Sequence, residues 1–298
     1  MELQGRVDEL TAQGLGLTAI SYDSPELLAD FSRRHRITFP LLSDTGSATI
    51  TTYGILNTVA DEALETRPGN ATLREDVKKY VATNGSRSVA ELTKGTPFPG
   101  TFVVDREGRV TARFFEEYYR ERNTASSILL RLGNGAPPVA ATRIAAAHLD
   151  ITAYASDSTV SPGTRFALAV SVVPRPRIHV YAPGADANGY RVVSLSVAPQ
   201  PFVRTLPIRY PPSEIYDFKP LDERVPVYRK AFTLLREVVV EVTSEAERAL
   251  RDRKTLTMTG VLEYQACDDK VCFTPATVPL TWTVALTPNI TERPNRPQ

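Results

Sequence analysis

The sequence is poor in cysteine and histidine. Its 298 residues include only two cysteines and three histidines, at positions 35, 148 and 179. A structural zinc site needs about four ligands, and no pair of these residues recurs at ligand spacing. We therefore expect neither a metal nor a cofactor, and the two cysteines remain as candidates for disulfide chemistry.

Long apolar runs and an excess of one charge are also missing. No apolar stretch approaches the ~20 residues that span a bilayer, and the N-terminus lacks the charged-then-apolar pattern of a signal peptide. The formal net charge is +1, with 23% charged residues, which gives no reason to expect a nucleic acid or an acidic substrate as a partner. We expect no membrane span in this chain.

Cys267 and Cys272 lie between two segments with the pattern of strands. Apolar and polar residues alternate over 256–266 and again over 277–286, and this period of two indicates half-buried strands. The cysteines are thus expected at the mouth of a β-hairpin, where two Cβ atoms can come within disulfide range. Spacing alone leaves a structural disulfide and a redox-active dithiol equally open.

The length of the chain suggests two domains. Residues 1–133 alternate between helices and strands, whereas residues 144–288 contain short strands with proline- and glycine-bearing turns, which fit an all-β sandwich. Residues 134–143 are rich in glycine, proline and alanine and are expected to form a linker. Residues 289–298 are polar and are expected to form a disordered tail.

Individual elements follow from periodicity and from end signals. In the first domain, we expect strands at 17–23 and 39–44, a helix that Ser24 caps and Pro25 opens, a hairpin over 101–114, a last helix at 125–132, and an insertion at 57–95 with a helix at 73–81. In the second domain, we expect strands at 149–155, 165–173, 178–181, 190–197, 230–234, 237–242, 256–266 and 277–286, and a short helix at 244–253.

A resemblance favours the redox interpretation of the cysteine pair. The stretches Tyr264-Gln265-Ala266-Cys267 and Cys272-Phe273-Thr274-Pro275 resemble the active-site hairpin in the N-terminal periplasmic domain of the DsbD family of thiol:disulfide interchange proteins. Over residues 144–288 the resemblance implies an immunoglobulin-like sandwich whose cysteines exchange electrons with dithiol or disulfide redox proteins outside the cytoplasm. The loop between the cysteines is shorter here than in that family, so neither potential nor partner is carried over.

The same resemblance implies weaker supporting roles near the disulfide. Tyr264 and Gln265 belong to the hairpin motif. Tyr216 or Phe218 lies where the family carries a loop that caps its disulfide with an aromatic ring. His179 ends a strand and could act as a base, although a structural role is the simpler interpretation. We expect Cys267 to be the attacking thiol.

The first domain carries a second resemblance. The stretches 16–24, 39–44, 53–55 and 100–105 resemble the alkyl hydroperoxide reductase/thiol-specific antioxidant family of peroxiredoxin- and thioredoxin-like proteins. The chain begins inside the helix that carries the peroxidatic cysteine in that family, and no cysteine precedes Cys267. The resemblance thus implies an incomplete α/β thioredoxin-like domain without its central strand and active-site turn, arising from a truncated start or as a pseudo-domain kept for binding.

Pro99 marks a departure from the peroxiredoxin pattern. Peroxiredoxins place an arginine two residues before Thr101, whereas thioredoxin-like reductases of the TlpA type place a cis-proline there. We therefore expect a cis bond between Phe98 and Pro99, since cis peptide bonds are almost confined to X–Pro. This resemblance favours disulfide reduction over peroxide reduction.

We predict that the chain carries out thiol–disulfide exchange through Cys267 and Cys272, with an extracytoplasmic location implied by resemblance. One alternative is a non-catalytic binding or scaffold protein with a structural disulfide. Another is a fragment of a peroxidase whose peroxidatic cysteine lies upstream of Met1.

Overall fold

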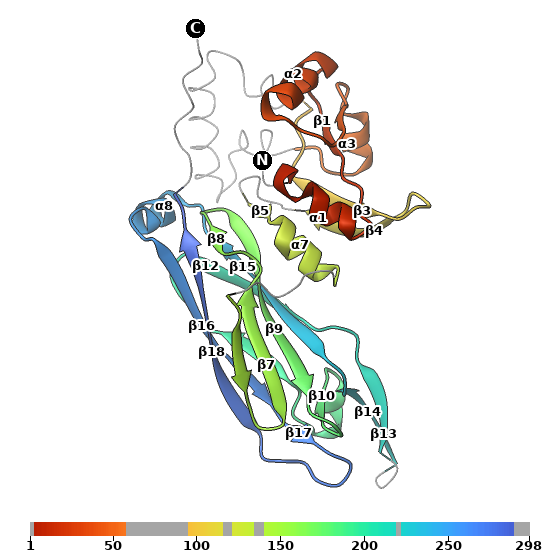
Figure 1. The fold of residues 1–298 in the computed structure, drawn as a ribbon, viewed down its shortest axis with the longest axis vertical. Helices are drawn as coiled ribbons and strands as arrows, with labels where there is room; N and C mark the ends of the chain where they lie inside the picture. Colours follow the sequence, from red (N-terminus) through yellow and green to blue (C-terminus); the bar gives the residue numbers. More distant parts are fainter. Residues whose placement is uncertain (1–2, 58–94, 116–120, 134–139, 219–221, 289–298) are drawn as a thin grey trace, which may run out of the picture. The chain divides into compact units, whose positions relative to one another are not determined.

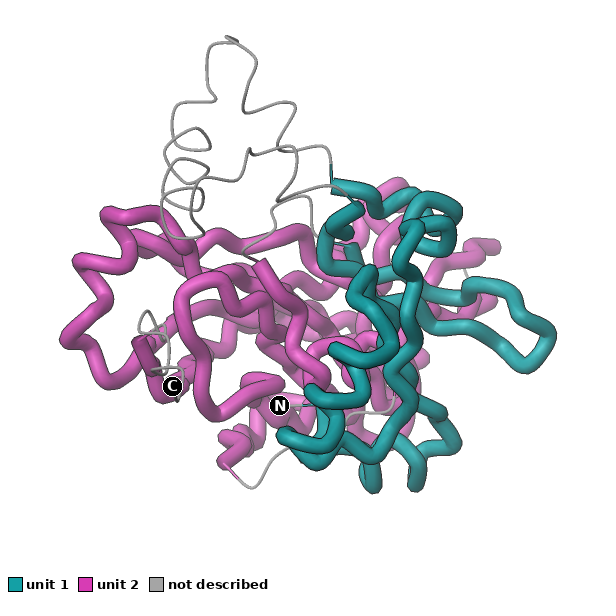
Figure 2. The backbone as a smooth tube through the Cα atoms, turned by 90° about the horizontal axis from the view of Figure 1, so that it is seen from above, with its two compact units in different colours: residues 1–119 teal, residues 120–298 magenta. Residues whose placement is uncertain are grey.

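The chain divides into two compact units. The computed structural model describes residues 3–57, 95–115, 121–133, 140–218 and 222–288. Unit 1 is Met1–Tyr119 and unit 2 is Arg120–Gln298 (Figure 2). The predicted insertion helix at 73–81, most of the predicted linker and the predicted tail lie outside the described residues.

Unit 1 combines short helices with two separate two-stranded sheets (Figure 1). Its elements are η1 (Gln4–Arg6), α1 (Val7–Ala12), β1 (Ala19–Ser21), α2 (Pro25–His35), β2 (Leu41–Ser43), α3 (Ala48–Thr52), β3 (Gly100–Val104) and β4 (Val110–Phe115). Ser24 caps α2 as predicted, because its hydroxyl oxygen accepts a hydrogen bond from the Leu27 amide at 3.4 Å. Gly108, with a φ of 82°, lies in the turn between β3 and β4.

In the part of unit 1 that the structure describes, the two sheets share no strand. β1 pairs in parallel with β2, and β3 pairs antiparallel with β4. In the described part of unit 1, no strand pairs with both β1 and β3. Among the described residues, one edge of each of these strands has no partner strand.

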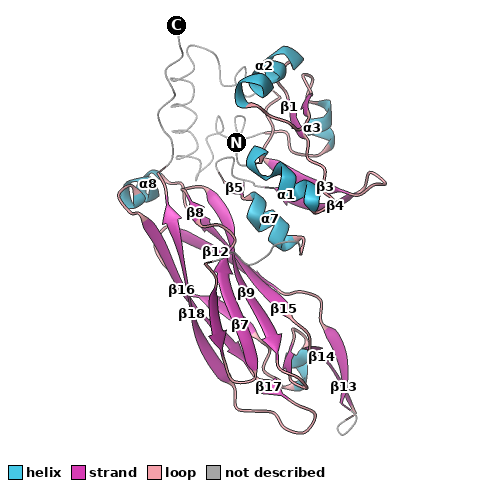
Figure 3. Ribbon diagram, in the orientation of Figure 1, coloured by secondary structure: helices cyan, strands magenta, loops and turns pink. Residues whose placement is uncertain are grey.

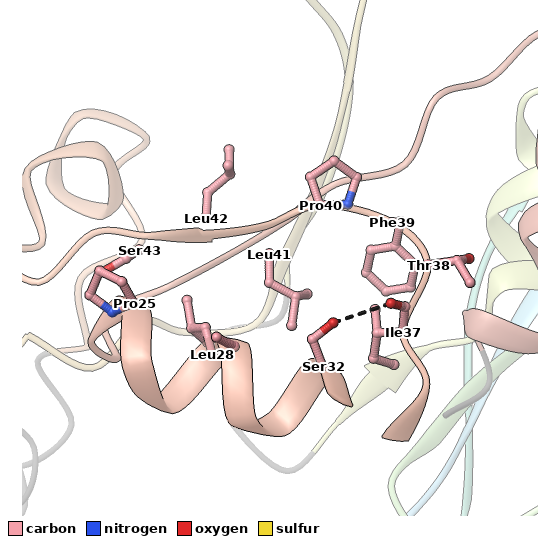
Figure 4. Close-up of a pocket in the computed structure, with 11 residues that line it drawn as sticks. Pro25, Leu28, Ser32, Ile37, Thr38, Phe39, Pro40, Leu41, Leu42 and Ser43 are labelled. Atoms are coloured by element: carbon pink, nitrogen blue, oxygen red, sulfur yellow. Dashed lines mark hydrogen bonds between the residues drawn. The ribbon is translucent and has the colours of Figure 1, made fainter. Parts of the chain in front are cut away.

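The apolar core of unit 1 is thin. Among its described residues, the buried apolar side chains are those of Ile50 and Phe114. A groove of about 560 Å³ lies between α2 and β2 and is lined mainly by apolar side chains, including those of Leu28, Ile37 and Leu41 (Figure 4). Most apolar side chains in the described part of unit 1 are therefore at least partly exposed.

The predicted cis bond before Pro99 is wrong. The bond between Phe98 and Pro99 is trans, and the described residues contain no cis peptide bond. Pro99 directly precedes β3, and the Phe98 amide donates a hydrogen bond to the Ile55 carbonyl at 2.7 Å. A proline before a strand needs no cis bond, and the trans form of an X–Pro bond is favoured by about 0.5–1 kcal/mol.

Unit 2 is rich in strands, which form three sheets (Figures 1 and 3). The largest sheet has the order β12 (Val203–Arg209), β15 (Phe232–Val240), β9 (Thr164–Pro174), β7 (Leu149–Ala155) and β6 (Thr142–Ala145), with β5 (Arg122–Asn123) beside β9. The second sheet has the order β11 (Ser194–Val197), β16 (Thr255–Tyr264), β18 (Ala276–Leu286) and β8 (Thr159–Val160). The third has the order β13 (Glu214–Phe218), β14 (Glu223–Tyr228), β10 (His179–Tyr181) and β17 (Ala266–Cys267).

One large apolar core joins the three sheets. Side chains from strands of all three sheets enter it, such as Phe166 and Leu168 from β9, Leu262 and Tyr264 from β16, and Val180 from β10. This burial follows the period-two pattern of the sequence. The helices η2 (Ala185–Asn188) and α8 (Ser244–Leu250) lie in connections between strands.

Helix α7 (Ala125–Arg131) belongs to unit 2, whereas the sequence analysis assigned it to the first domain. Leu130 packs against a small cluster formed by Tyr154, Ala169 and Leu235. Arg131 forms an ion pair with the buried Glu237 at 3.2 Å. These contacts fix α7 on the largest sheet of unit 2.

Several further elements differ from the predictions; β12 and β14, for example, were not predicted. The strands predicted at 230–234 and 237–242 form one continuous strand, β15, because Leu235 and Arg236 keep the ladder with β9. β6 starts at Thr142, inside the predicted linker. Residues 214–218, predicted as a loop, form β13, which pairs with β14 in a hairpin.

Candidate functional site

The chain changes sheets directly before the first cysteine. β16 ends at Tyr264 beside β18, and after Gln265 the chain continues as β17, which pairs with β10. The Gln265 side-chain amide donates a hydrogen bond to the Phe273 carbonyl at 3.1 Å. The cysteines lie at the mouth of the β16–β18 hairpin as predicted, but Cys267 belongs to the third sheet.

Cys267 and Cys272 form a disulfide with a Cα–Cα distance of 4.1 Å. The two residues also form an isolated antiparallel bridge. They differ in their access to solvent, because Cys267 is only 1% exposed whereas Cys272 is exposed. Cys272 is therefore the cysteine that meets solvent, and Cys267 is enclosed by its surroundings.

Hydrogen bonds from its own backbone hold the loop between the cysteines. One carboxylate oxygen of Asp268 accepts from the amides of Lys270 and Val271 at 2.7 and 2.8 Å. These two hydrogen bonds lower the pKa of Asp268. The Asp268 amide in turn donates to the Val271 carbonyl at 3.0 Å. The loop thus places a carboxylate next to Cys267.

The disulfide lies on the face of the third sheet that points away from the large core. Val180, Tyr228 and Ala266 point into the large core. Their neighbours along the three strands, Tyr181, Val227 and Cys267, therefore point to the opposite face of the sheet. There, a second buried cluster gathers around Cys267, and we call it the cysteine cluster. Its buried members are Tyr181, Ala185, Val225, Val227 and Cys267, with Tyr190, Val192 and Tyr216 packed against them.

Tyr181 is the residue of this cluster whose side chain reaches Cys272. Its hydroxyl oxygen lies 3.6 Å from the Cys272 sulfur. Its ring stacks on that of Tyr190 with 4.1 Å between centroids, and the Tyr190 hydroxyl donates a hydrogen bond to Glu223. Burial raises the pKa of Tyr181 well above its usual value, so this hydroxyl keeps its proton and can donate.

Tyr216 links the β13 strand to the cysteine loop. Its hydroxyl donates a hydrogen bond to an Asp269 carboxylate oxygen at 2.8 Å. The Arg229 guanidinium lies 5.6 Å from the centre of its ring. Of the two aromatic residues predicted near the disulfide, the structure brings Tyr216 to the loop from a strand, and the side chain of Phe218 lies outside the described set.

The remaining predicted residues occupy different places. His179 pairs with Cys267 across the β10–β17 ladder. Tyr264 lies in the large core, where its hydroxyl donates to the Ala147 carbonyl at 2.6 Å. Pro99 belongs to unit 1, and both cysteines belong to unit 2.

Sequence reasoning assigned no role to Tyr181, Tyr190 or Glu223. Tyr181 could have been found, because it lies two residues after His179 on a predicted strand and therefore on the same face. Tyr190 and Glu223 could not be found from the sequence, because they lie far apart along the chain and only the structure shows that they are in contact.

The described residues were also compared with the requirements of a metal site and of a membrane-spanning helix. No group of three or more histidine, cysteine, aspartate or glutamate side chains is placed to hold a metal ion there. Within the same part of the chain, no helix combines the length and the apolar character needed to cross a bilayer.

Comparisons with solved structures give weak similarities. The N-terminal periplasmic domain of ScsB from Proteus mirabilis matches with 18% identity and a TM-score of 0.32 over 46% of this chain and 49% of that chain. The N-terminal domain of DsbD from Neisseria meningitidis, in its reduced form, matches with 15% identity and a TM-score of 0.27 over 40% of this chain and 81% of that chain. The first match spans only about half of the ScsB chain, and similarities of this size establish no fold.

The family comparison gives a result for unit 1. No curated protein matches the chain. The model of the AhpC/TSA family matches residues 1–113, which confirms the resemblance found in the sequence of the first domain. Over these residues, the chain is therefore similar to the AhpC/TSA family.

Proposed function

We propose that the chain carries out thiol–disulfide exchange through Cys267 and Cys272. The observation that supports this most directly is the unequal exposure of the two cysteine residues in one disulfide. Exchange requires one sulfur that a partner thiolate can reach in line and a second that leaves with the electron pair. Here Cys272 meets the first requirement and Cys267 the second.

The proposed exchange takes place between the Cys267–Cys272 disulfide and two thiols of one partner protein. A partner thiolate attacks the Cys272 sulfur, the Cys267–Cys272 bond breaks, and Cys267 leaves as a thiolate. A second thiol of the partner then attacks the partner sulfur of the mixed disulfide, so that the partner's own disulfide forms, the bond to Cys272 breaks, and Cys267 and Cys272 are left reduced. In this mechanism Cys272 contacts the partner, whereas the sequence analysis expected Cys267 to be the attacking thiol.

The partner in this proposal is a protein with a dithiol or a disulfide at its active site. We propose an immunoglobulin-like sandwich for unit 2 and an extracytoplasmic location, where a disulfide such as Cys267–Cys272 persists. Because both cysteines of the sequence lie in unit 2, unit 1 of this chain supplies no thiol of its own. We propose that it contributes binding surface only.

A trapping experiment with single-cysteine variants tests the proposal. Cys267→Ala and Cys272→Ala are each mixed with a thioredoxin-type protein whose lone exposed cysteine is activated with thionitrobenzoate. We expect Cys267→Ala to displace the dye at least about ten times faster, because its remaining thiol is exposed. If neither variant displaces the dye, the disulfide is structural and the chain is a binding protein.

A further inference from the structure

His179 is a buried polar residue without a hydrogen-bond partner for its ring Nε2 atom. Its side chain is 3% exposed, and Nε2 finds no partner among the described residues. An unpaired polar group in a protein interior destabilises the fold, because it loses its hydrogen bonds to water. Such groups in a folded protein call for a functional explanation.

The position of His179 beside Cys267 suggests why an unpaired imidazole is kept there. It pairs directly with Cys267 in the antiparallel β10–β17 ladder. Residues paired in this way extend from the same face of a sheet, with Cβ atoms about 5 Å apart. The His179 side chain therefore lies on the same face of the sheet as the side chain of the buried Cys267.

The groups around His179 come from four elements. The Tyr216 ring of β13 lies 4.8 Å from its ring, and the Tyr181 ring of β10 lies 5.4 Å away. The charges that act on it are Asp269 and Asp268 from the cysteine loop and Arg229 after β14. Burial is the largest influence and lowers the pKa of His179, with Arg229 acting in the same direction and the two aspartates against it. The imidazole is neutral at neutral pH and can accept a proton.

We propose that His179 accepts the proton of the Cys267 thiol when this thiol resolves a mixed disulfide between Cys272 and a partner. The inference rests on the proposed function. A thiol in apolar surroundings ionises less readily than in water, so a buried resolving thiol needs a base on its own side of the sheet.

The step conserves atoms and electrons. His179 takes the proton from the Cys267 sulfur, and the resulting thiolate attacks the Cys272 sulfur. The Cys267–Cys272 bond forms while the bond between Cys272 and the partner sulfur breaks, and the partner leaves as a thiolate that takes a proton from water. In the reverse direction, the imidazolium returns the proton to Cys267 as its sulfur leaves.

Proton NMR of the full-length chain gives the first test. With three histidines in the sequence, the ring signals are few, and that of His179 is identified by its loss in His179→Gln. In the reduced protein His179 and the Cys267 thiol share a proton, so the pH at which His179 titrates depends on the redox state. We expect its midpoint to differ by about half a pH unit or more between oxidised and reduced protein. His35, which is exposed on α2 in unit 1, serves as the internal control. An identical titration of His179 in both states would overturn the proposal.

Kinetics give the second test. The reduced chain reacts with Ellman's reagent in two phases, first at the exposed Cys272 and then when Cys267 displaces the second thionitrobenzoate. We expect His179→Gln to slow the second phase at neutral pH by about tenfold to a hundredfold and leave the first phase unchanged. The matched control His35→Gln leaves both phases unchanged, and thermal melts verify that the variants fold.

The outcomes separate the two proposals. A second phase of wild-type rate and pH profile in His179→Gln would overturn the role of His179 while thiol exchange stands. A disulfide that yields no free thiols under reducing conditions would overturn the exchange function and, with it, the role of His179.

Discussion

The hydroxyl oxygen of Tyr181 lies 3.6 Å from the sulfur of Cys272. The donor is held in place by the stacked ring of Tyr190, and burial keeps it protonated because it raises the pKa of Tyr181. After reduction, this hydroxyl can donate to the Cys272 thiolate, and a hydrogen bond to a charged group stabilises by about 1.5–3 kcal/mol.

Replacing Tyr181 by Phe removes this donor. In a Cys267→Ala background, we expect Tyr181→Phe to raise the pKa of the remaining thiol by about one unit, because one pKa unit corresponds to about 1.4 kcal/mol. The thiolate absorbance near 240 nm, followed against pH, gives the value. The control is Tyr228→Phe, which removes a buried hydroxyl bonded to the Pro211 carbonyl on the opposite face. Equal pKa values in the Tyr181 variant and its parent would show that the contact has no influence on the thiolate.

Helix α7 is predicted to stabilise unit 2. A fragment of residues 140–288 loses the packing of Leu130 and the ion pair between Arg131 and Glu237, both of which a fragment of residues 121–288 keeps. We expect the shorter fragment to be less stable by about 2–4 kcal/mol, from lost apolar burial and a weakened buried ion-pair network. Urea unfolding of the two fragments measures the difference, and equal midpoints would show that α7 contributes nothing.

How much of this site could be predicted from the sequence depends on how local each signal is. The alternation around the cysteines predicted the hairpin, because it involves neighbouring residues. The change of sheet at Gln265 was not predictable, since Tyr264 and Ala266 keep the same alternation whichever strand lies beside them. Helix α7 was predicted from its own residues, but Glu237, more than a hundred residues later, decides which unit it packs on.

Strand β13 could not be predicted from the sequence for a different reason. Glu214, Tyr216 and Asp217 give only weak apolar alternation, so their strand depends on pairing with β14. The predicted cis bond at Pro99 was wrong because it rested on a resemblance, whereas the backbone at this position needs no special geometry. Contacts between distant residues, such as that of Tyr216 with Asp269, required the structure.

The buried Glu237 predicts a pH dependence of stability. Burial raises the pKa of this carboxyl group, but the hydrogen bond from Arg165 and the charges of Arg165, Arg131 and Arg209 together hold it below the usual 4.5. A carboxylate with a lowered folded-state pKa contributes stability that is present above the unfolded value and lost as the pH falls through the folded value. The loss is therefore expected below about pH 4.5.

The variant Glu237→Gln tests this dependence. At neutral pH we expect it to be less stable than the wild type by about 3–5 kcal/mol, because the buried arginines lose their partner. The difference should shrink as the pH falls from 4.5 toward 3, since the wild type then loses its carboxylate as well. Glu263→Gln is the matched control, as its carboxylate forms only an exposed pair with Arg191 at 3.7 Å. A difference in unfolding free energy that stays constant over this range would contradict the prediction.

Unit 1 is predicted to fold poorly by itself. Ile20, Leu42 and Val104 are 41%, 48% and 44% exposed, and they lie on two separate two-stranded sheets. Isolated two-stranded sheets are marginally stable in water, and exposed apolar strands aggregate. We expect residues 1–119 alone to melt without a cooperative transition and to bind a hydrophobic dye, whereas residues 121–288 melt cooperatively. A sharp melt of the 1–119 fragment without dye binding would contradict this expectation.

The reduction potential of the Cys267–Cys272 disulfide tests the central claim most directly. The full-length chain is equilibrated with thiol/disulfide buffers of known potential, and the free thiols are trapped and counted. Structural disulfides usually lie below about −300 mV, and working exchangers lie well above this value. A redox-active pair with the exposed Cys272 as its entry point predicts a potential above about −280 mV. A disulfide that stays closed in excess dithiothreitol under native conditions would contradict the account.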